Sequence, residues 1–158
     1  MSRFALVAVG GTFDHLHVGH KSLLSKAFQC GDRVILGVTS DSFLAKSEKN
    51  LSAIQPFEVR VSRLREFLSR NGFLDRCEII ELDDPYGPLI RNPKIEAVAV
   101  SRETAARAAE ANVIRASKGQ PKLELCVIDL VLAEDARPIS SRRIRNKEID
   151  EVGNLIRP

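Results

Sequence analysis

The chain has little of several things that mark whole classes of protein. Its 158 residues include no tryptophan, one tyrosine (Tyr86) and three cysteines far apart in the sequence, Cys30, Cys77 and Cys126. An odd number of cysteines without a C-x-x-C pair does not make a disulfide framework, and it predicts reduced thiols in a cytoplasm. The lack of tryptophan and tyrosine leaves little surface on which nucleic-acid bases could stack. We therefore expect neither a disulfide-rich secreted protein nor a nucleic-acid-binding one.

A large charge of one sign and a long apolar run are also missing. Lys and Arg number 24 against 21 acids, and the net charge of +3 is too small to indicate nucleic acid or a membrane as partner. No stretch approaches the roughly 20 apolar residues of a membrane span. The apolar run at residues 4–9 is too short for a signal peptide. These absences favour a soluble, cytoplasmic protein without a membrane partner.

What the sequence does contain is an alternation of two patterns. Short apolar runs predict strands at 4–9, 34–38, 77–82, 95–100 and 123–132. Helical spacing of apolar residues lies between them, and helices are expected at about 18–30, 56–71, 101–118 and 140–147. This order predicts an α/β fold, a Rossmann-like three-layer sandwich with a five-stranded parallel sheet. The length is that of one domain, spanning residues 1–158.

Two helix boundaries carry specific expectations. Gly31 follows the first helix, where a glycine in the left-handed conformation commonly ends a helix. Ser101 precedes the alanine-rich helix, where its hydroxyl is expected to cap the first turn.

The loop after the first strand, residues 10–20, is the leading candidate for a binding site. In a parallel sheet, ligands bind beyond the carboxyl ends of the strands, and the next helix offers free N–H groups to a phosphate. Gly10 and Gly11 allow tight curvature, and all three histidines lie at positions 15–20. His17 and His20 are three apart and face one side of the first helical turn, with Gly19 leaving room between them. The loop matches neither the Walker A nor the dinucleotide-binding pattern.

Two other interpretations of these histidines stay open. They serve structure alone, as solvated or capping residues at a helix start. Alternatively, imidazoles bind zinc, although His15 and His17 flank Leu16 and no cysteine lies nearby, so we expect no protein-held metal site.

Residues 12–20, Thr-Phe-Asp-His-Leu-His-Val-Gly-His, resemble the (H/T)-x-G-H signature of the nucleotidylyltransferase superfamily. With Gly10 and Gly11 in front, the segment is similar to phosphopantetheine adenylyltransferases of the archaeal and eukaryotic type. Ile139, Ser140, Ser141 and Arg145 resemble the second signature of the superfamily, I-S-S-T-x-x-R, with Arg142 in place of the usual threonine. The segments 83–88 and 101–104 also look like the archaeal pattern. The resemblance therefore implies one nucleotidylyltransferase domain.

The basic segment 137–147 carries five cations and no acid. A solvated basic helix is the usual fate of such a run. A helix that begins at Ser140 and Ser141 after the last strand would instead be a second phosphate cradle, since hydroxyls and guanidinium groups donate to phosphate oxygens. Arg142 is then expected either to contact the β- or γ-phosphate or to face solvent.

The resemblance implies transfer of the adenylyl group of ATP to 4′-phosphopantetheine, giving dephospho-CoA and pyrophosphate. It assigns catalysis to His20, His17 and Lys46. It places ATP on Gly10, Gly11, Thr12, Phe13, Asp14, His17, Gly19, His20, Ser140, Ser141, Arg142 and Arg145, and the acceptor on Thr12, Lys46 and Lys49. The expected cofactor is Mg²⁺, bound mainly through the phosphates and water. A monomer is favoured over an oligomer.

Several alternatives remain at this point. Another small-substrate enzyme of the superfamily, an FAD synthetase or a glycerol-3-phosphate cytidylyltransferase, has a similar first turn, although residues 83–88 favour pantetheine. Class I aminoacyl-tRNA synthetases share H-x-G-H, but this chain is short and lacks K-M-S-K-S. A non-catalytic nucleotide-binding module would bind ATP without releasing pyrophosphate.

Overall fold

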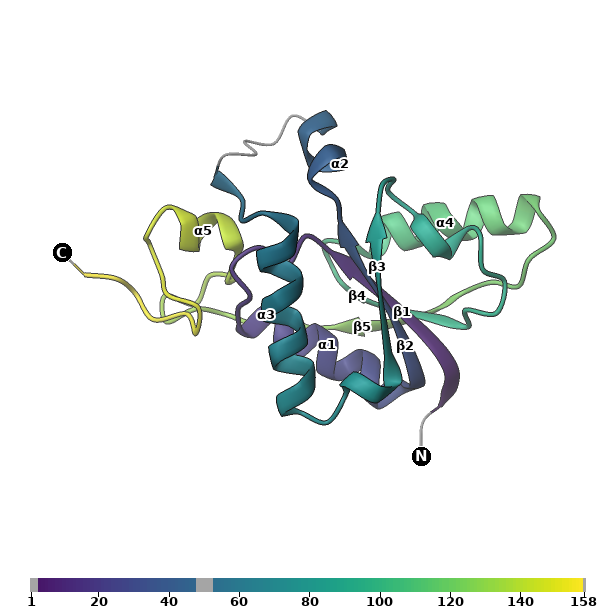
Figure 1. Cartoon of the computed structure of the whole chain (residues 1–158), viewed down its shortest axis with the longest axis horizontal. Coiled ribbons are helices and arrows are strands. Elements are labelled where there is room, and N and C mark those ends of the chain that lie inside the picture. Colours follow the sequence, from purple (N-terminus) through teal and green to yellow (C-terminus); the bar gives the residue numbers. More distant parts are fainter. Residues whose placement is uncertain (1–2, 48–52, 158) are drawn as a thin grey trace.

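The computed structural model describes residues 3–47 and 53–157, and a five-stranded parallel sheet forms the centre of this part (Figure 1). Its spatial order is β3-β2-β1-β4-β5. The strands are β1 (Phe4–Gly11), β2 (Gly31–Thr39), β3 (Cys77–Leu82), β4 (Ala97–Ser101) and β5 (Glu124–Ile128). The expected fold class, a Rossmann-like α/β sandwich with five parallel strands, is confirmed. The strand order reverses between β1 and β4, and such a switch point is where open α/β sheets bind ligands.

Helices cover both faces of the sheet and complete three layers. They are α1 (Val18–Cys30), α2 (Asp41–Lys46), α3 (Phe57–Arg70), α4 (Ala105–Ser117) and α5 (Ser141–Arg145), with short 3₁₀ turns η2 (Leu74–Arg76) and η3 (Gly87–Leu89). Residues of α1 and α3 pack on one face, around Val9 and Leu36. Residues of α4 pack on the other face, around Ala8 and Val98. Within the described residues, no helix has the length and apolar character needed to cross a bilayer.

The C-terminal segment after β5 has its own small core. Ala133, Ile139 and Ile149 are buried together, and Val18 of α1 packs against them. The backbone N–H of Val18 also donates to the carbonyl oxygen of Glu151. In Figure 1 this segment, with α5, lies beside α3. The last part of the chain is therefore held close to the start of α1.

Two sequence-based boundaries, at the fifth strand and at Ser101, were wrong for identifiable reasons, whereas Gly31 follows the first helix as expected. The fifth strand ends at Ile128 because the chain then turns away, and Leu132 pairs with Pro138 in an antiparallel bridge. Ser101 is the last residue of β4, and its N–H donates to the hydroxyl of Thr104, which is the N-cap of α4. Gly31 does follow α1 but is extended (φ −122°). A glycine is needed there because a Cβ would lie 2.6 Å from Cγ2 of Val7.

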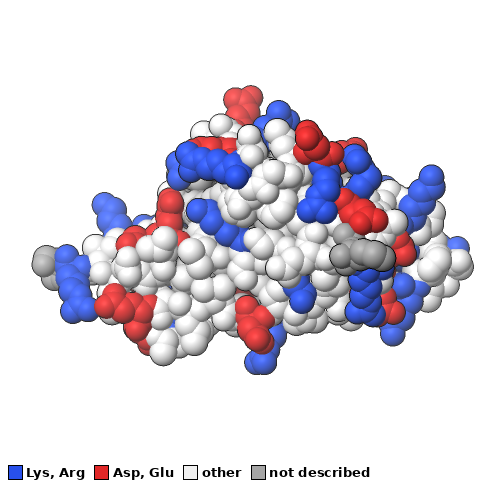
Figure 2. All heavy atoms as spheres, turned by 90° about the horizontal axis from the view of Figure 1, so that it is seen from below, with Lys and Arg blue, Asp and Glu red and all other residues white. Residues whose placement is uncertain are grey.

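Charged side chains are spread over the surface. On the face seen in Figure 2, basic and acidic residues alternate around the edges, with an uncharged area between them. Outside the grey atoms of that view, no large patch of one sign is visible.

Candidate active site

His17 and His20 are locked together at the start of α1. His17 is the N-cap, and its Nδ1 accepts from the backbone N–H of Gly19 at 3.0 Å and from that of His20 at 3.4 Å. In return, the backbone N–H of His17 donates to Nδ1 of His20 at 3.2 Å. This reciprocal capping satisfies N–H groups that a helix start otherwise leaves without partners. The two rings stack with their centroids 3.6 Å apart.

Burial sets the protonation state of both rings, and these hydrogen bonds set their tautomer. Burial lowers the pKa of His17 from 6.5 to about 4. Burial, and then the neighbouring His17, lower the pKa of His20 to about 3. Both rings are therefore neutral at neutral pH. A neutral imidazole has one acceptor and one donor nitrogen, and since each Nδ1 accepts, each Nε2 carries the proton. Each ring thus offers one N–H donor on the side away from the helix.

The tight turn before α1 requires unusual residues. A Cβ at position 19 would lie 2.9 Å from Cε1 of His17, so only glycine fits beneath the stacked ring. Phe13 and His15 have left-handed backbones, with φ of 56° and 45°. Such conformations cost energy for non-glycine residues and persist only where the surroundings impose them. The buried ring of Phe13 lies 5.3 Å from the ring of His20, which it supports.

Asp14 joins the first loop to α5. Its side chain is 1% exposed, and Oδ2 accepts from Nη1 of Arg145 at 2.7 Å. Its Oδ1 accepts from the backbone N–H of Gln55 at 2.8 Å, and its carbonyl oxygen accepts from the hydroxyl of Ser141 at 2.7 Å. A buried carboxylate needs a charged partner, so this ion pair anchors α5 to the loop. The two sequence signatures are thereby brought together.

A polar cavity of about 330 Å³ lies between the first loop and α5. It is lined by Thr12, Phe13, Asp14, His20, Ala53, Ile54, Ser141 and Arg145. Six of the predicted ATP-binding residues therefore surround one space. The hydroxyl of Thr12 accepts from that of Thr39 at 3.1 Å, which leaves the Thr12 proton for another partner.

Other predicted site residues lie elsewhere. His17 is 6% exposed, behind His20, and Gly10 and Gly11 line a different pocket. The Ser140 hydroxyl caps α5 by accepting from the N–H of Arg143. Lys46, the last residue of α2, and Arg142 are both exposed and line neither pocket. Lys49 lies outside the described residues.

The basic segment is partly neutralised by acids from elsewhere. Arg143 is buried and pairs with Asp135, and Arg137 pairs with Asp135 and Glu148. Their guanidinium groups hold the pKa of Asp135 down at about 2, against the effect of burial. Arg142, by contrast, makes no ion pair with any residue that the structure describes. Only some of the five cations of this segment are therefore available to a ligand.

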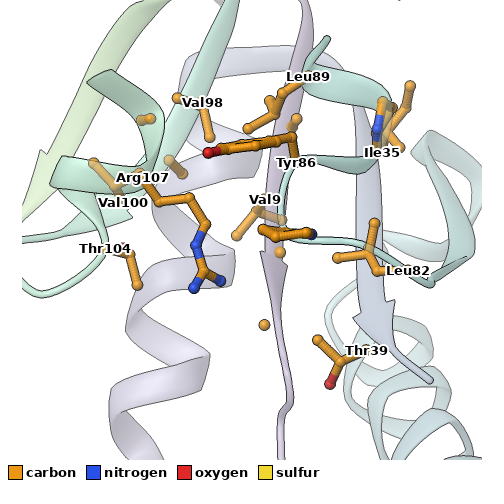
Figure 3. A pocket seen from close by; sticks show the side chains of 18 of the residues that line it. Val9, Ile35, Thr39, Leu82, Tyr86, Leu89, Val98, Val100, Thr104 and Arg107 are labelled. Atoms are coloured by element: carbon orange, nitrogen blue, oxygen red, sulfur yellow. The ribbon is translucent and has the colours of Figure 1, made fainter. Parts of the chain in front are cut away.

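A second, apolar pocket opens on the α4 side of the sheet (Figure 3). Its lining includes Val9, Ile35, Leu82, Leu89, Val98 and Val100, with Gly10, Gly11 and Thr39 at the strand ends. In Figure 3 the ring of Tyr86 lies across the pocket, and the guanidinium of Arg107 points along it toward the carboxyl ends of the strands. Thr39 borders this pocket and Thr12 borders the polar cavity, so their hydroxyl pair lies where the two spaces meet.

Apart from Gly10 and Gly11, the residues that line this pocket were not predicted as site residues from the sequence. Tyr86 lies in the segment 83–88 and Thr104 in 101–104, two stretches noticed for their resemblance but given no role. Apolar lining residues have the same periodicity as core residues, so nothing in the sequence separates them.

Residues 8–147 match the cytidylyltransferase-like family. The phosphopantetheine adenylyltransferase of Methanopyrus kandleri is 46% identical over 151 residues, covering 96% of this chain and 94% of that protein. That of Methanothermobacter thermautotrophicus is also 46% identical, covering 98% and 92%. The chain belongs to the phosphopantetheine adenylyltransferase family. The family resemblance expected from the two signatures is thereby confirmed.

Solved structures agree with this membership at the level of the fold. A protein of unknown function from Archaeoglobus fulgidus, 31% identical, superposes with a TM-score of 0.69 over 80% of this chain and 99% of its own. A bifunctional NMN adenylyltransferase/ADP-ribose pyrophosphatase from Francisella tularensis, 17% identical, gives 0.62 over 91% of this chain and 41% of its own. For a phosphopantetheine adenylyltransferase family member, the cavity between the two signatures is the candidate active site.

Proposed function

We propose that this protein transfers the adenylyl group of ATP to 4′-phosphopantetheine and releases dephospho-CoA and pyrophosphate. The observation that carries the proposal is the meeting of two unlike spaces. A polar cavity with an imidazole, a guanidinium and hydroxyls suits a triphosphate, and an apolar pocket suits the pantetheine arm. Family membership and the placement of both spaces at the switch point of the sheet support the same assignment.

The reaction is a direct displacement at the α-phosphorus. An oxygen of the acceptor phosphate forms a bond to the α-phosphorus of ATP while the bond from that phosphorus to the bridging oxygen of the β-phosphate breaks. The bridging oxygen leaves with the electron pair as part of pyrophosphate. Because the nucleophile is already an anion, the protein needs no strong base. Positioning and stabilisation of developing charge supply the acceleration.

His20 is the central donor in this proposal. Its Nε2–H donates to the α-phosphate oxygens as their charge grows, and a neutral ring with a fixed tautomer needs no reorganisation to do so. Thr12 donates its hydroxyl proton to the acceptor phosphate or the α-phosphate, because its oxygen already accepts from Thr39. Phe13 keeps the His20 ring in place, and Gly19 allows the ring stack.

The remaining phosphates lie toward α5. Arg145 and Ser141 line the cavity and clamp the triphosphate, with Asp14 orienting Arg145. We assign His17 to the β- and γ-phosphates, beside His20. Two lysines, Lys46 and Lys49, follow β2 in the sequence, and we assign the bridge between the reacting phosphates to Lys46, with Lys49 as the alternative. Lys46 is exposed, so this role requires its flexible side chain to reach inward. Ser140 contributes by capping α5, and Arg142, at the outer edge of the clamp, contributes little. Gly10 and Gly11 let substrate approach the backbone.

Magnesium enters as part of the ATP substrate. Asp14 is the only carboxylate that the structure places in the lining of the polar cavity, and its two oxygens already bind Arg145 and the N–H of Gln55. Within the described residues, no group of three or more His, Cys, Asp or Glu could hold a metal ion. We assign the magnesium ligands mainly to phosphate and water oxygens, which Mg²⁺ commonly prefers at nucleotide sites.

The assignment also includes setting and assembly. We place the enzyme in the cytoplasm, in line with its three cysteines, which are free thiols. Residues 1–158 act as one nucleotidylyltransferase domain, and we favour a monomer over an oligomer.

The test is pyrophosphate release by purified protein with ATP and Mg²⁺. Phosphopantetheine, FMN and glycerol 3-phosphate are offered separately, and ATP with no acceptor is the blank. The expected result is that, of the three acceptors, only phosphopantetheine gives pyrophosphate release. Preference for FMN or glycerol 3-phosphate would instead assign an FAD synthetase or a cytidylyltransferase-like activity, and CTP replaces ATP in a parallel series. ATP binding without pyrophosphate release in the presence of any of these acceptors would indicate a non-catalytic nucleotide-binding module.

A further inference from the structure

A buried arginine outside the predicted site holds the edge of the sheet on which the reaction is proposed to occur. Arg60 of α3 is 0% exposed. Its Nη1 donates to the carbonyl oxygens of Thr12 at 2.9 Å and Thr39 at 2.8 Å. Thr12 directly follows β1, and Thr39 is the last residue of β2. The Nη2 of Arg60 donates to Oδ1 of Asp41 at 2.9 Å. One guanidinium therefore fixes the distance between two neighbouring strand ends and the start of α2.

The same side chain connects to the other wall of the cavity. Nε of Arg60 donates to the carbonyl oxygen of Gln55 at 2.8 Å. The backbone N–H of Gln55 donates to Asp14, and its side-chain Oε1 accepts from the N–H of His15. Gln55 thus links Arg60 to the Asp14–Arg145 ion pair. The strand ends and α5 are held by one continuous chain of hydrogen bonds.

We propose that Arg60 is a positioning residue for adenylyl transfer, acting through the Thr12–Thr39 pair. This inference rests on the proposed function. Arg60 holds the carbonyl oxygens of both threonines, and their side-chain hydroxyls are hydrogen-bonded to each other at the junction of the two substrate spaces. Only the planar fork of a guanidinium reaches all four oxygens at once, which lysine cannot reproduce. Thr12 positions one of the two reacting phosphates, and Arg60 positions Thr12.

The molecule offers a matched control. Arg115 of α4 is also 0% exposed, and its guanidinium donates to carbonyl oxygens including those of Pro121, Leu89 and Ile95. These carbonyls lie before β4 and β5, not at the strand ends; because Leu89 also lines the apolar pocket, kcat is compared separately from KM for the acceptor. Both arginines are buried and bound mainly to backbone oxygens, so both substitutions weaken the fold. Only Arg60 contacts the strand ends at the proposed reaction centre.

The experiment compares Arg60→Lys, Arg115→Lys and wild type with ATP and phosphopantetheine, after circular dichroism and thermal unfolding have measured the folded fraction. For Arg60→Lys we expect kcat per folded molecule to fall by about 10²-fold, as for loss of alignment, with KM for both substrates within a few-fold of wild type. Arg115→Lys should lower the melting temperature and keep kcat within about twofold. Equal kcat in the two variants overturns the inference.

A second variant covers the case in which Arg60→Lys does not fold. Thr39→Val keeps the shape of a buried strand residue and removes the hydroxyl that donates to Thr12. We expect it to lower kcat by about tenfold without a matching rise in KM. Where Arg60→Lys folds, the double variant should lose less than the product of the two single losses, because both act through Thr12. An unchanged kcat in Thr39→Val overturns the inference. Inactive wild-type enzyme would instead overturn the proposed function, and this inference with it.

Discussion

The two spaces at the carboxyl edge of the sheet are built in opposite ways. In the polar cavity, lining groups such as Asp14, Arg145 and Ser141 are already hydrogen-bonded or paired within the protein. In the apolar pocket, side chains such as Leu82, Val98 and Tyr86 supply shape, with few polar groups. The contrast indicates that one half is preorganised for charge and the other is selected for fit. Substitutions in the first should change kcat, and those in the second should change KM for the acceptor.

The largest effect is expected at His20. His20→Ala should lower kcat by about 10²-fold or more, with ATP affinity less affected, because it removes a donor that acts on charge developing in the transition state. Steady-state pyrophosphate release and direct ATP titration measure the two quantities. His15→Asn is the matched control, because it also removes an imidazole from this loop. Asparagine tolerates the left-handed backbone of position 15.

His20→Asn separates chemistry from capping. Asparagine keeps an acceptor near the place of Nδ1, which receives the N–H of His17, but has no counterpart of Nε2–H. It should retain most of the stability and still lose turnover. Full activity in this variant would mean that His20 serves only the helix start.

In the apolar pocket we expect a smaller effect on a different constant. Ala108 is 2% exposed and lines the pocket, so Ala108→Leu adds bulk to the space assigned to the pantetheine arm. KM for phosphopantetheine should rise by about tenfold, while the Kd of ATP stays unchanged. Kinetics at varied acceptor and calorimetric ATP titration measure the two. A rise in the Kd of ATP alone would show that the apolar pocket does not hold the pantetheine arm.

Acid should lower the free energy of unfolding, through the buried His17. The pKa of His17 falls from 6.5 to about 4 on folding, so the unfolded chain binds more protons between those values. Stability is therefore complete above pH 6.5 and decreases toward pH 4, by on the order of 3 kcal/mol from this residue. Thermal unfolding from pH 4 to 8 measures the loss, which should shrink in His17→Asn, since asparagine caps helices without titrating. Identical profiles would show that His17 titrates alike in both states.

The smallest effect is expected at Arg142. Its side chain is exposed and lines neither space, and threonine is the residue usual at this position of the signature. Arg142→Thr should keep kcat and KM for ATP within about twofold. A large loss would show that the guanidinium reaches the triphosphate and would extend the polar half outward.

Much of the fold followed from periodicity, and the failures have physical causes. The apolar runs identified all five strands, because buried parallel strands are apolar on both faces. The fifth strand was drawn too long because Val131 is as apolar as a strand residue but packs against the C-terminal core instead. Ser101 does not cap α4, because a turn that periodicity does not show separates the strand from the helix start; Thr104 is at the N-cap position, and its hydroxyl bonds back to the backbone of Ser101.

The candidate site was predictable where the residues are adjacent in the sequence. The His17–Gly19–His20 cluster is visible by eye, whereas the partners of Asp14 lie 41 and 131 residues away. Arg60 carried a faint signal, because it interrupts the apolar stripe of its helix between Phe57 and Leu64. An arginine on that face needs buried acceptors, but the sequence does not say which carbonyls they are.

The sequence separation of Asp14 and Arg145 also determines when their ion pair can form during synthesis of the chain. The two residues are separated by 131 positions, which a ribosome adding about 5–20 residues per second covers in roughly 7–26 s. For that interval the Asp14 carboxylate is without its guanidinium partner from α5. Under the proposed function, the cavity is therefore completed late in translation, and a chain that ends before α5 should lack the Arg145 clamp on the leaving pyrophosphate.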